Sequence, residues 1–138
     1  MLIRNAAFEV VIELGDRAIV GGYLVTKAFN RGQRSRRRLV TEAVRVDSSY
    51  EVASSLTKQR LLLPVYVHGV TEEESRDRHR ALVAAVEAQR WFLDETGDGD
   101  TAVWECDPAD EAASPRLFPG NLERILTFSI PAHPAFGR

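Results

Sequence analysis

Residues 61–93 read LLLPVYVHGVTEEESRDRHRALVAAVEAQRWFL and join a strand pattern directly to a helix pattern. Thr71 and Glu74 form a capping box at the junction, because the threonine hydroxyl can accept from the backbone N–H three residues later while the glutamate reaches back. The acidic first turn also suits the positive end of a helix. We therefore predict a helix from Thr71 to about Leu93, with a core-facing stripe at i, i+3, i+4 and i+7 spacing that is apolar except for one glutamine: Leu82, Ala85, Val86, Gln89, Phe92 and Leu93.

The strand before this helix is predicted over Leu56–His68. Its run Leu61–Leu63 indicates burial on both faces. Pro64 removes one backbone donor, so the strand is expected to lie at a sheet edge or to bulge there. At the other end of the helix, residues 96–100 (TGDGD) predict a loop, with Gly97 as a left-handed cap.

Two strands are predicted near the N-terminus. Phe8–Leu14 alternates large apolar side chains with glutamates and a valine, which is typical of a half-buried strand. Arg17–Phe29 is rich in β-branched and aromatic residues, and Gly21-Gly22 indicates a bend within it. A turn at residues 15–16 would join the two strands into a β-hairpin.

Further strands and loops are predicted in the rest of the chain. Asn30–Arg38 is predicted as a basic loop, Leu39–Asp47 as a strand and Ser48–Ser55 as a connection. After the helix, Thr101–Cys106 and Asn121–Ile130 predict two more strands, separated by a proline-rich loop. The order ββ, loop, ββ, α, ββ predicts a single α+β domain over residues 1–138, a mainly antiparallel sheet or β-sandwich with one flanking α-helix.

Composition sets broad limits on the function. The 138 residues are 44% hydrophobic and 28% charged, which is ordinary for a globular domain. The single cysteine excludes an internal disulfide framework, and no apolar run reaches the roughly 20 residues of a membrane span. The start of the sequence lacks the basic and apolar regions of a signal peptide. We therefore expect a soluble protein made in a reducing compartment.

Charge is divided unevenly along the chain. Residues 1–60 carry 11 basic and 6 acidic side chains, whereas residues 61–138 carry 7 basic and 14 acidic ones. Such asymmetry favours contact between unlike surfaces, including head-to-tail contact between copies of this chain, although a solvated surface with chance clustering would also produce it.

Motifs for catalysis or metal binding are not evident. His68, His79 and His133 have no short ligand spacing among them, and Cys106 has no second cysteine with which to hold zinc. The acidic neighbours of Cys106 would raise the pKa of a thiol, so a small buried side chain is its expected role. The sequence also contains no nucleophile elbow and no phosphate-binding glycine loop. We expect no enzyme activity, no catalytic or metal-ligating residues and no cofactor.

The strongest local anomaly is the basic segment at residues 31–38, whose arginines are Arg31, Arg34, Arg36, Arg37 and Arg38. Arginine forks bind phosphate or carboxylate groups, so this segment could contact nucleic acid or an acidic surface of a neighbouring subunit. It contains no aromatic side chain on which a base could stack. A protein interface, a plain solvated loop and nucleic-acid binding all remain open at this point.

Residues 61–134 resemble a known family in the order of their motifs. A strand ending in V-x-G-x-[ST] is followed by a helix ending in W-x-L, then by AVWECDPAD, which contains W-x-C-x-P-A-D, and finally by RILTFSIPAHP, which ends in S-I-P-x-x-P. This order resembles the small tail terminator, tail-ring and minor tail proteins of long-tailed bacteriophages of actinobacterial hosts. Residues 1–60 resemble the family only in style, as hairpin, loop and strand.

The resemblance implies a structural virion protein of the phage tail, made in the cytoplasm of the host bacterium. Its fold would be the β-sandwich with one flanking helix of tail tube and terminator proteins. Its copies would form a ring, hexameric in the family, that caps or extends the tail tube and meets neighbouring tail or head–tail connector proteins. DNA would pass through the channel without sequence-specific binding, and no membrane is implied.

The resemblance also implies roles for three sets of residues. The basic segment would be a loop that contacts a neighbouring subunit or faces the channel. A second contact loop would contain Ser48, Ser49, Tyr50, Ser54 and Ser55. The helix would pack on the sheet through Leu82, Val86, Trp91, Phe92 and Trp104.

Two alternatives accompany the terminator-like interpretation. A distal tail or tail-tube protein would share the same fold and ring symmetry. A nucleic-acid-binding module that uses the arginine segment belongs to a different class, and the net negative charge of −2 counts against it.

Overall fold

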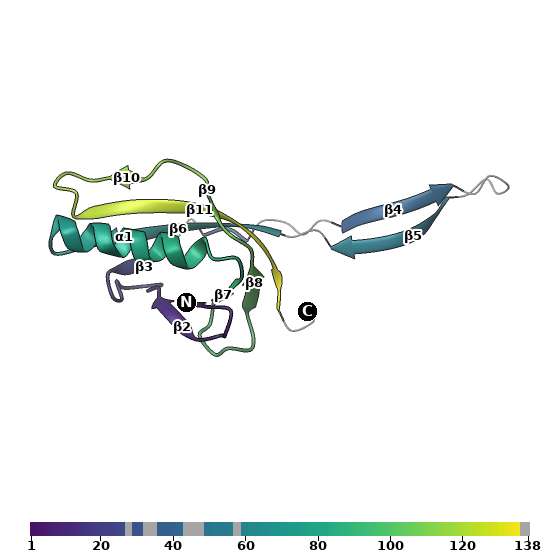
Figure 1. The fold of residues 1–138 in the computed structure, drawn as a ribbon, viewed down its shortest axis with the longest axis horizontal. Coiled ribbons are helices and arrows are strands. Elements are labelled where there is room, and N and C mark those ends of the chain that lie inside the picture. Colours follow the sequence, from purple (N-terminus) through teal and green to yellow (C-terminus); the bar gives the residue numbers. More distant parts are fainter. Residues whose placement is uncertain (27–28, 32–35, 43–48, 57–58, 136–138) are drawn as a thin grey trace.

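The computed structural model describes residues 1–26, 29–31, 36–42, 49–56 and 59–135 (Figure 1). Its framework is the antiparallel pairing of β6 (Gln59–His68) with β11 (Glu123–Pro134), which keeps one register from His68 opposite Glu123 to Gln59 opposite Ala132. Side chains alternate along both strands, so that one face of the pair is apolar and buried. That face consists of Leu61, Leu63, Val65 and Val67 of β6 with Leu126, Phe128 and Ile130 of β11.

Two sequence predictions about β6 are wrong. Leu62 remains 38% exposed, so the leucine run is buried on one face only. Pro64 lies inside the sheet, because β6 is flanked by both β11 and β3 (Tyr23–Val25). The proline carbonyl accepts from the N–H of Thr26, just past the end of β3, which puts the missing donor of Pro64 on that side. The ladder with β11 is therefore unaffected.

β6 and β11 belong to one antiparallel sheet with the order β2-β1-β7-β8-β11-β6-β3, to which the short strands β9 and β10 are added along β11. This arrangement confirms a mainly antiparallel α+β fold. The remaining strands of the sheet are β1 (Leu2–Arg4), β2 (Val10–Glu13), β7 (Trp91–Asp94), β8 (Val103–Cys106), β9 (Asp110–Glu111) and β10 (Arg116–Leu117).

The two ends of this strand order meet. Gly15, just after β2, forms a parallel bridge with Leu24 of β3. The Gly15 N–H donates to the Tyr23 carbonyl over 3.2 Å, and the Gly15 carbonyl accepts from the Val25 N–H over 2.8 Å. The sheet therefore curls until its first and last strands are joined through one residue.

The single helix of the described residues, α1 (Glu72–Val86), begins where the sequence predicts. The Glu74 N–H donates to the Thr71 hydroxyl over 3.1 Å, and Thr71 has the extended backbone of an N-cap. The Glu74 carboxylate pairs with Arg78 on the helix surface. Leu82 and Val86 are buried in the main core, and Figure 1 shows α1 lying along β6 and β11.

The predicted helix end is wrong. α1 stops at Val86, and residues 91–94 form β7, which pairs with β1 on one side and β8 on the other. Gln89, Phe92 and Leu93 continue the helical spacing, but Trp91 and Leu93 also fit the two-residue period of a strand. Pairing with two neighbouring strands decides between these periods. Gly97 accordingly lies in the β7–β8 loop, with φ of 78°, and is not a helix cap.

The N-terminal hairpin is also formed by different strands. β2 pairs with β1, a three-residue strand that the sequence pattern did not indicate, whereas β3 pairs with β6. Phe8 has a φ of 66° in the connection between β1 and β2. The predicted strands at Thr101–Cys106 and Asn121–Ile130 correspond to β8 and β11, and β11 continues through Pro131 to Pro134.

A separate two-stranded sheet consists of β4 (Arg36–Glu42) and β5 (Ser49–Leu56). Its register runs from Arg36 opposite Leu56 to Glu42 opposite Ser49, with a shift between Leu39 and Val40. In the described part of the chain, the extensive contacts of β4 and β5 are with each other, and Figure 1 shows the hairpin extending away from the large sheet.

Among the residues that the structure describes, no helix is long and apolar enough to cross a membrane.

Because the two ends of the sheet meet at Gly15, we expect a single methyl group added at this residue to lower the stability of the protein strongly. A Cβ at this position would lie 1.7 Å from the Ala18 carbonyl oxygen, so Gly15→Ala must displace the backbone that closes the sheet. We expect a loss of more than about 2 kcal/mol in the free energy of unfolding, measured by urea denaturation.

Gly21→Ala is the matched control for this closure. Gly21 has a φ of 57° and no atom within 4 Å of the added Cβ, so only backbone strain of about 1 kcal/mol is expected. An equal loss in the two variants would mean that the close approach at Gly15 does not hold the sheet together.

Candidate interaction surface

The arginines of the predicted basic loop lie in two different parts of the structure. Arg36, Arg37 and Arg38 are the first three residues of β4, so their assignment to a loop is wrong. The strand predicted over Leu39–Asp47 overlaps β4, which begins three residues earlier, at Arg36, and ends at Glu42. Arg31 lies before the hairpin, beside the large sheet, and Arg34 lies outside the described residues.

The predicted second contact loop is likewise a strand. Ser49, Tyr50, Ser54 and Ser55 all belong to β5, and Ser48 lies outside the described residues. The register places Arg37 opposite Ser55 and Arg38 opposite Ser54. The two sets that the sequence analysis treated as separate loops are therefore adjacent strands of one hairpin.

Arg31 forms an ion pair with Glu95, which directly follows β7. Its Nε donates to Oε2 of Glu95 over 3.2 Å, and its Nη2 donates to Oε1, so the guanidinium and carboxylate planes meet through two hydrogen bonds. These bonds raise the pKa of the Arg31 guanidinium above its ordinary value. The Arg31 guanidinium also lies 5.3 Å from the centre of the Phe29 ring.

Glu95 is held from the other side by Trp104 of β8. The indole Nε1 donates to Oε2 of Glu95 over 2.7 Å. The Glu95 side chain is only 9% exposed, whereas the Arg31 side chain is 59% exposed. The carboxylate is therefore part of the protein body, and the guanidinium covers it from the solvent side.

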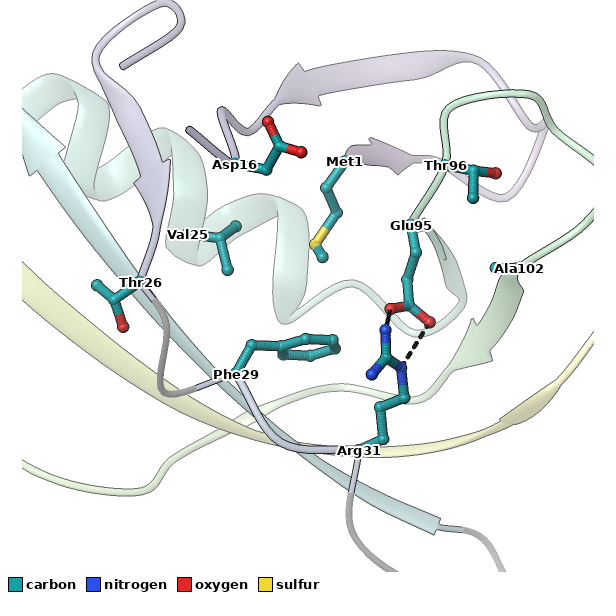
Figure 2. Close-up of a pocket in the computed structure, with 9 residues that line it drawn as sticks. All are labelled: Met1, Asp16, Val25, Thr26, Phe29, Arg31, Glu95, Thr96 and Ala102. Atoms are coloured by element: carbon teal, nitrogen blue, oxygen red, sulfur yellow. Dashed lines mark hydrogen bonds and ion pairs between the residues drawn. The ribbon is translucent and has the colours of Figure 1, made fainter. Parts of the chain in front are cut away.

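The ion pair borders a hollow of about 330 Å³, shown in Figure 2. Its apolar wall includes Met1, Val25, Phe29 and Ala102, and its polar lining includes Asp16, Thr26 and Thr96. In Figure 2, Arg31 and Glu95 point toward each other across one end of this hollow.

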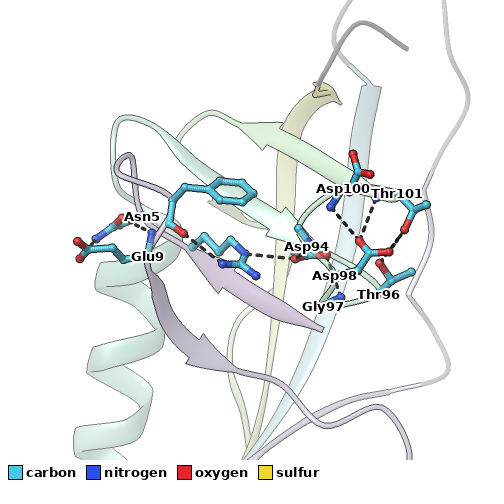
Figure 3. A network of polar contacts seen from close by, with 11 residues as sticks. Asn5, Glu9, Asp94, Thr96, Gly97, Asp98, Asp100 and Thr101 are labelled. Atoms are coloured by element: carbon cyan, nitrogen blue, oxygen red, sulfur yellow. Dashed lines mark hydrogen bonds and ion pairs between the residues drawn. The ribbon is translucent and has the colours of Figure 1, made fainter.

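The loop that carries Glu95 is fixed by Asp94, whose side chain is fully buried. Asp94 accepts from Nε of Arg4 over 3.2 Å, and its two oxygens accept from the N–H groups of Gly97 and Gly99, each over 2.8 Å. Figure 3 shows this network together with the contacts of Asp98. Hydrogen bonds from Thr101, through its side chain and its backbone, hold the pKa of Asp98 well below its ordinary value.

A second polar contact joins the helix to β11. Nη1 of the buried Arg124 lies 2.9 Å from Nδ1 of His79, and its Nη2 donates to the Asn121 carbonyl. Because a guanidinium can only donate, His79 must accept through Nδ1 and be neutral. Burial and the charge of Arg124 lower the pKa of His79 below its ordinary value.

The predicted helix–sheet packing set is partly brought together. Leu82 and Val86 share the main core with Trp91 and Trp104. Phe92 faces the opposite side of β7 and packs in a second cluster with Val103, Ala135 and Phe8, so its helix-packing role is wrong. Cys106 is buried in the main core, as predicted, and burial raises the pKa of its thiol.

The sequence predictions did not include Glu95 as the partner of Arg31, or Trp104 as the donor that holds Glu95. Arg31 and Glu95 are 64 positions apart, and only the tertiary fold brings them together. Comparison of the sequence with protein-family models and with curated proteins found no match.

Removing the Asp94 carboxylate should destabilise the fold. Asp94→Ala leaves Arg4 without its ionic partner and removes the acceptors for two loop N–H groups. We expect a loss of about 3 kcal/mol or more in the free energy of unfolding, measured by urea denaturation. Asp98→Ala, in the same loop but exposed, is the control and should cost clearly less. Equal losses would contradict the central role of Asp94.

The neutral state of His79 predicts a pH dependence of stability. Because the folded pKa is lowered, the unfolded chain binds the proton more readily, so stability is complete above about pH 6.5 and falls as the pH drops toward the folded pKa. Arg80 also lowers this pKa, while Glu111 opposes the shift.

His79→Asn retains an acceptor near the position of Nδ1 and removes the titration. We expect its free energy of unfolding to vary less between about pH 7.5 and pH 5 than that of the wild type. Identical slopes would contradict the assignment.

Proposed function

We propose that this protein is a structural component of a bacteriophage tail. The proposal rests first on the order of motifs over residues 61–134, which resembles the small tail terminator and tail-ring proteins. The mainly antiparallel α+β fold, with one helix against the sheet, is compatible with the β-sandwich of that family. The strongly curled sheet, whose ends meet at Gly15, is the feature that supports a sandwich-like arrangement.

The structural observation that favours an assembly role is the hairpin of β4 and β5. A two-stranded hairpin without a packed face is marginally stable in water. Contact with another molecule would supply the burial that the described body does not give to this hairpin. The hairpin is therefore the element best suited to reach a neighbouring subunit.

Charge favours another copy of the same chain as that neighbour. β4 begins with three arginines, whereas the body exposes acidic side chains on several elements. Contact between a basic hairpin and an acidic body is head-to-tail, and such interfaces close into rings when the rotation between subunits allows it. Exposed acidic residues of the body include Glu72, Glu73, Asp98, Asp100, Asp110 and Glu111.

We propose a terminator-like ring, hexameric as in the family, that caps or extends the tail tube and joins it to neighbouring tail or connector proteins. DNA would pass through its channel without sequence-specific contacts. A distal tail or tube position uses the same features, and the position of the gene relative to the tape-measure gene would distinguish them. A nucleic-acid-binding module remains the rival from another class, because arginines of the hairpin could also contact phosphates.

The test of assembly is the mass of the purified protein by light scattering, at low and high salt, with negative-stain images of the same samples. A ring with a central hole supports the proposal. A monomer that binds duplex DNA with a steep salt dependence would replace it with the nucleic-acid module.

Charge reversal tests the role of the hairpin directly. We expect Arg36→Glu, Arg37→Glu and Arg38→Glu together to weaken self-association, and the weakening to be largest at low salt, where charge contacts are least screened. The control reverses three exposed arginines of the body, Arg17, Arg80 and Arg116. An equal effect of the two triple variants, measured by light scattering, would indicate a general charge effect and contradict a specific contact by β4.

A further inference from the structure

The hollow of Figure 2 has the chemistry of a binding site for an arginine side chain. Arginine is recognised by a carboxylate that accepts two parallel hydrogen bonds and by an aromatic face near the guanidinium. Glu95 supplies the first feature and Phe29 the second. We propose that this hollow is a guanidinium-binding site, that Arg31 of the same chain fills it in the isolated molecule, and that an arginine side chain from another polypeptide can replace Arg31.

The carboxylate half of the site is built into the body. Glu95 is 9% exposed, and the indole N–H of Trp104 fixes one of its oxygens. Asp94, next in the chain, anchors the loop through Arg4 and two backbone N–H groups. A nearly buried carboxylate without a neighbouring cation is unfavourable. Glu95 therefore favours binding of another positive group when Arg31 leaves.

The arginine half is suited to exchange. More than half of the Arg31 side chain is exposed, so water can solvate its guanidinium when it leaves the pair. A competing guanidinium would regain the same two hydrogen bonds and the same ring contact. The hollow beside the pair, lined by Met1 and Ala102, leaves space for the aliphatic part of an incoming side chain.

Arg31 also connects this site to the hairpin. Its backbone carbonyl accepts from the Gln59 amide, and Gln59 is the first residue of β6. The ion pair of Arg31 with Glu95 therefore lies where the chain leaves the large sheet toward β4 and returns to it from β5. Exchange of the arginine would release one of the side-chain contacts at this base.

A vacant site allows the proposal to be tested without any assembly. In Arg31→Ala, Glu95 and Trp104 remain in place. The added probe is arginine amide, a free guanidinium with no carboxylate, and the readout is the pair of tryptophan indole N–H signals in a ¹H–¹⁵N spectrum. The chain has two tryptophans, and the Trp91 indole donates to the Asp107 carbonyl instead. We expect saturable movement of the Trp104 signal and little movement of the Trp91 signal.

Matched variants define the specificity. Arg31→Ala with Glu95→Gln should bind arginine amide about tenfold or more weakly, because the bonds lose their charged acceptor. Lysine amide should bind Arg31→Ala several-fold more weakly than arginine amide, because an ammonium cannot form the parallel pair. Arg31→Gln, which keeps one donor near Glu95, replaces Arg31→Ala if the alanine variant does not fold.

Arg90→Ala is the control for a similar pair elsewhere. Arg90 donates to Glu105 over 2.9 Å and lies 5.3 Å from the Phe92 ring, but the Glu105 side chain is 30% exposed. We expect no saturable response to arginine amide at this position. Equal responses in Arg31→Ala and Arg90→Ala, or no response in Arg31→Ala and Arg31→Gln, would overturn the proposal.

The source of the incoming arginine is distinguished in the same samples. Self-association of Arg31→Ala that arginine amide reverses identifies a second copy of this chain, an assignment that rests on the proposed function. Binding of arginine amide by a variant that stays monomeric excludes a second copy of this chain as the source of the arginine, which leaves an arginine of a different polypeptide. The guanidinium site itself stands in both cases, so failure of the ring proposal and failure of the site remain distinguishable.

Discussion

The pairing of β6 with β11 is the constraint on which the rest of the molecule depends. It supplies a continuous apolar face on which α1 packs, and it offers one outer edge to β3 and the other to β8, β9 and β10. Each of those smaller strands is short, and strands of two to four residues depend on a longer neighbour for their register. Loss of the long pair would leave the helix and both ends of the sheet without a surface to pack against.

Local signals in the sequence predicted this central part well. The capping hydroxyl of Thr71 identifies the start of α1, and the apolar patterns around it place the strands β6 and β11, because these signals involve residues that are close in the chain. The prediction that β6 is buried on both faces was wrong. The predicted end of α1 was wrong because residues 89–93 fit both the helical and the strand period. Contacts with β1 and β8, distant in sequence, determine the outcome.

The candidate surface was less predictable, for a different reason in each half. The strand pattern that begins at Leu39 was recognised, but the arginines before it and most of β5 have no apolar alternation in sequence and were assigned to loops. The carboxylate that receives Arg31 is 64 residues away, in a loop that composition marks only as polar. The charge of the basic segment was visible in the sequence, but its division between an intramolecular ion pair and a strand required the fold.

The hairpin also has a consequence for solubility. In the described structure β4 and β5 each leave one edge without a neighbouring strand, and such edges can recruit extended segments of other chains and begin aggregation. β4 begins with three consecutive arginines, and like charges at matching positions oppose the pairing of one hairpin with another in the same register. We expect these arginines to oppose amyloid-like growth, whatever the hairpin binds.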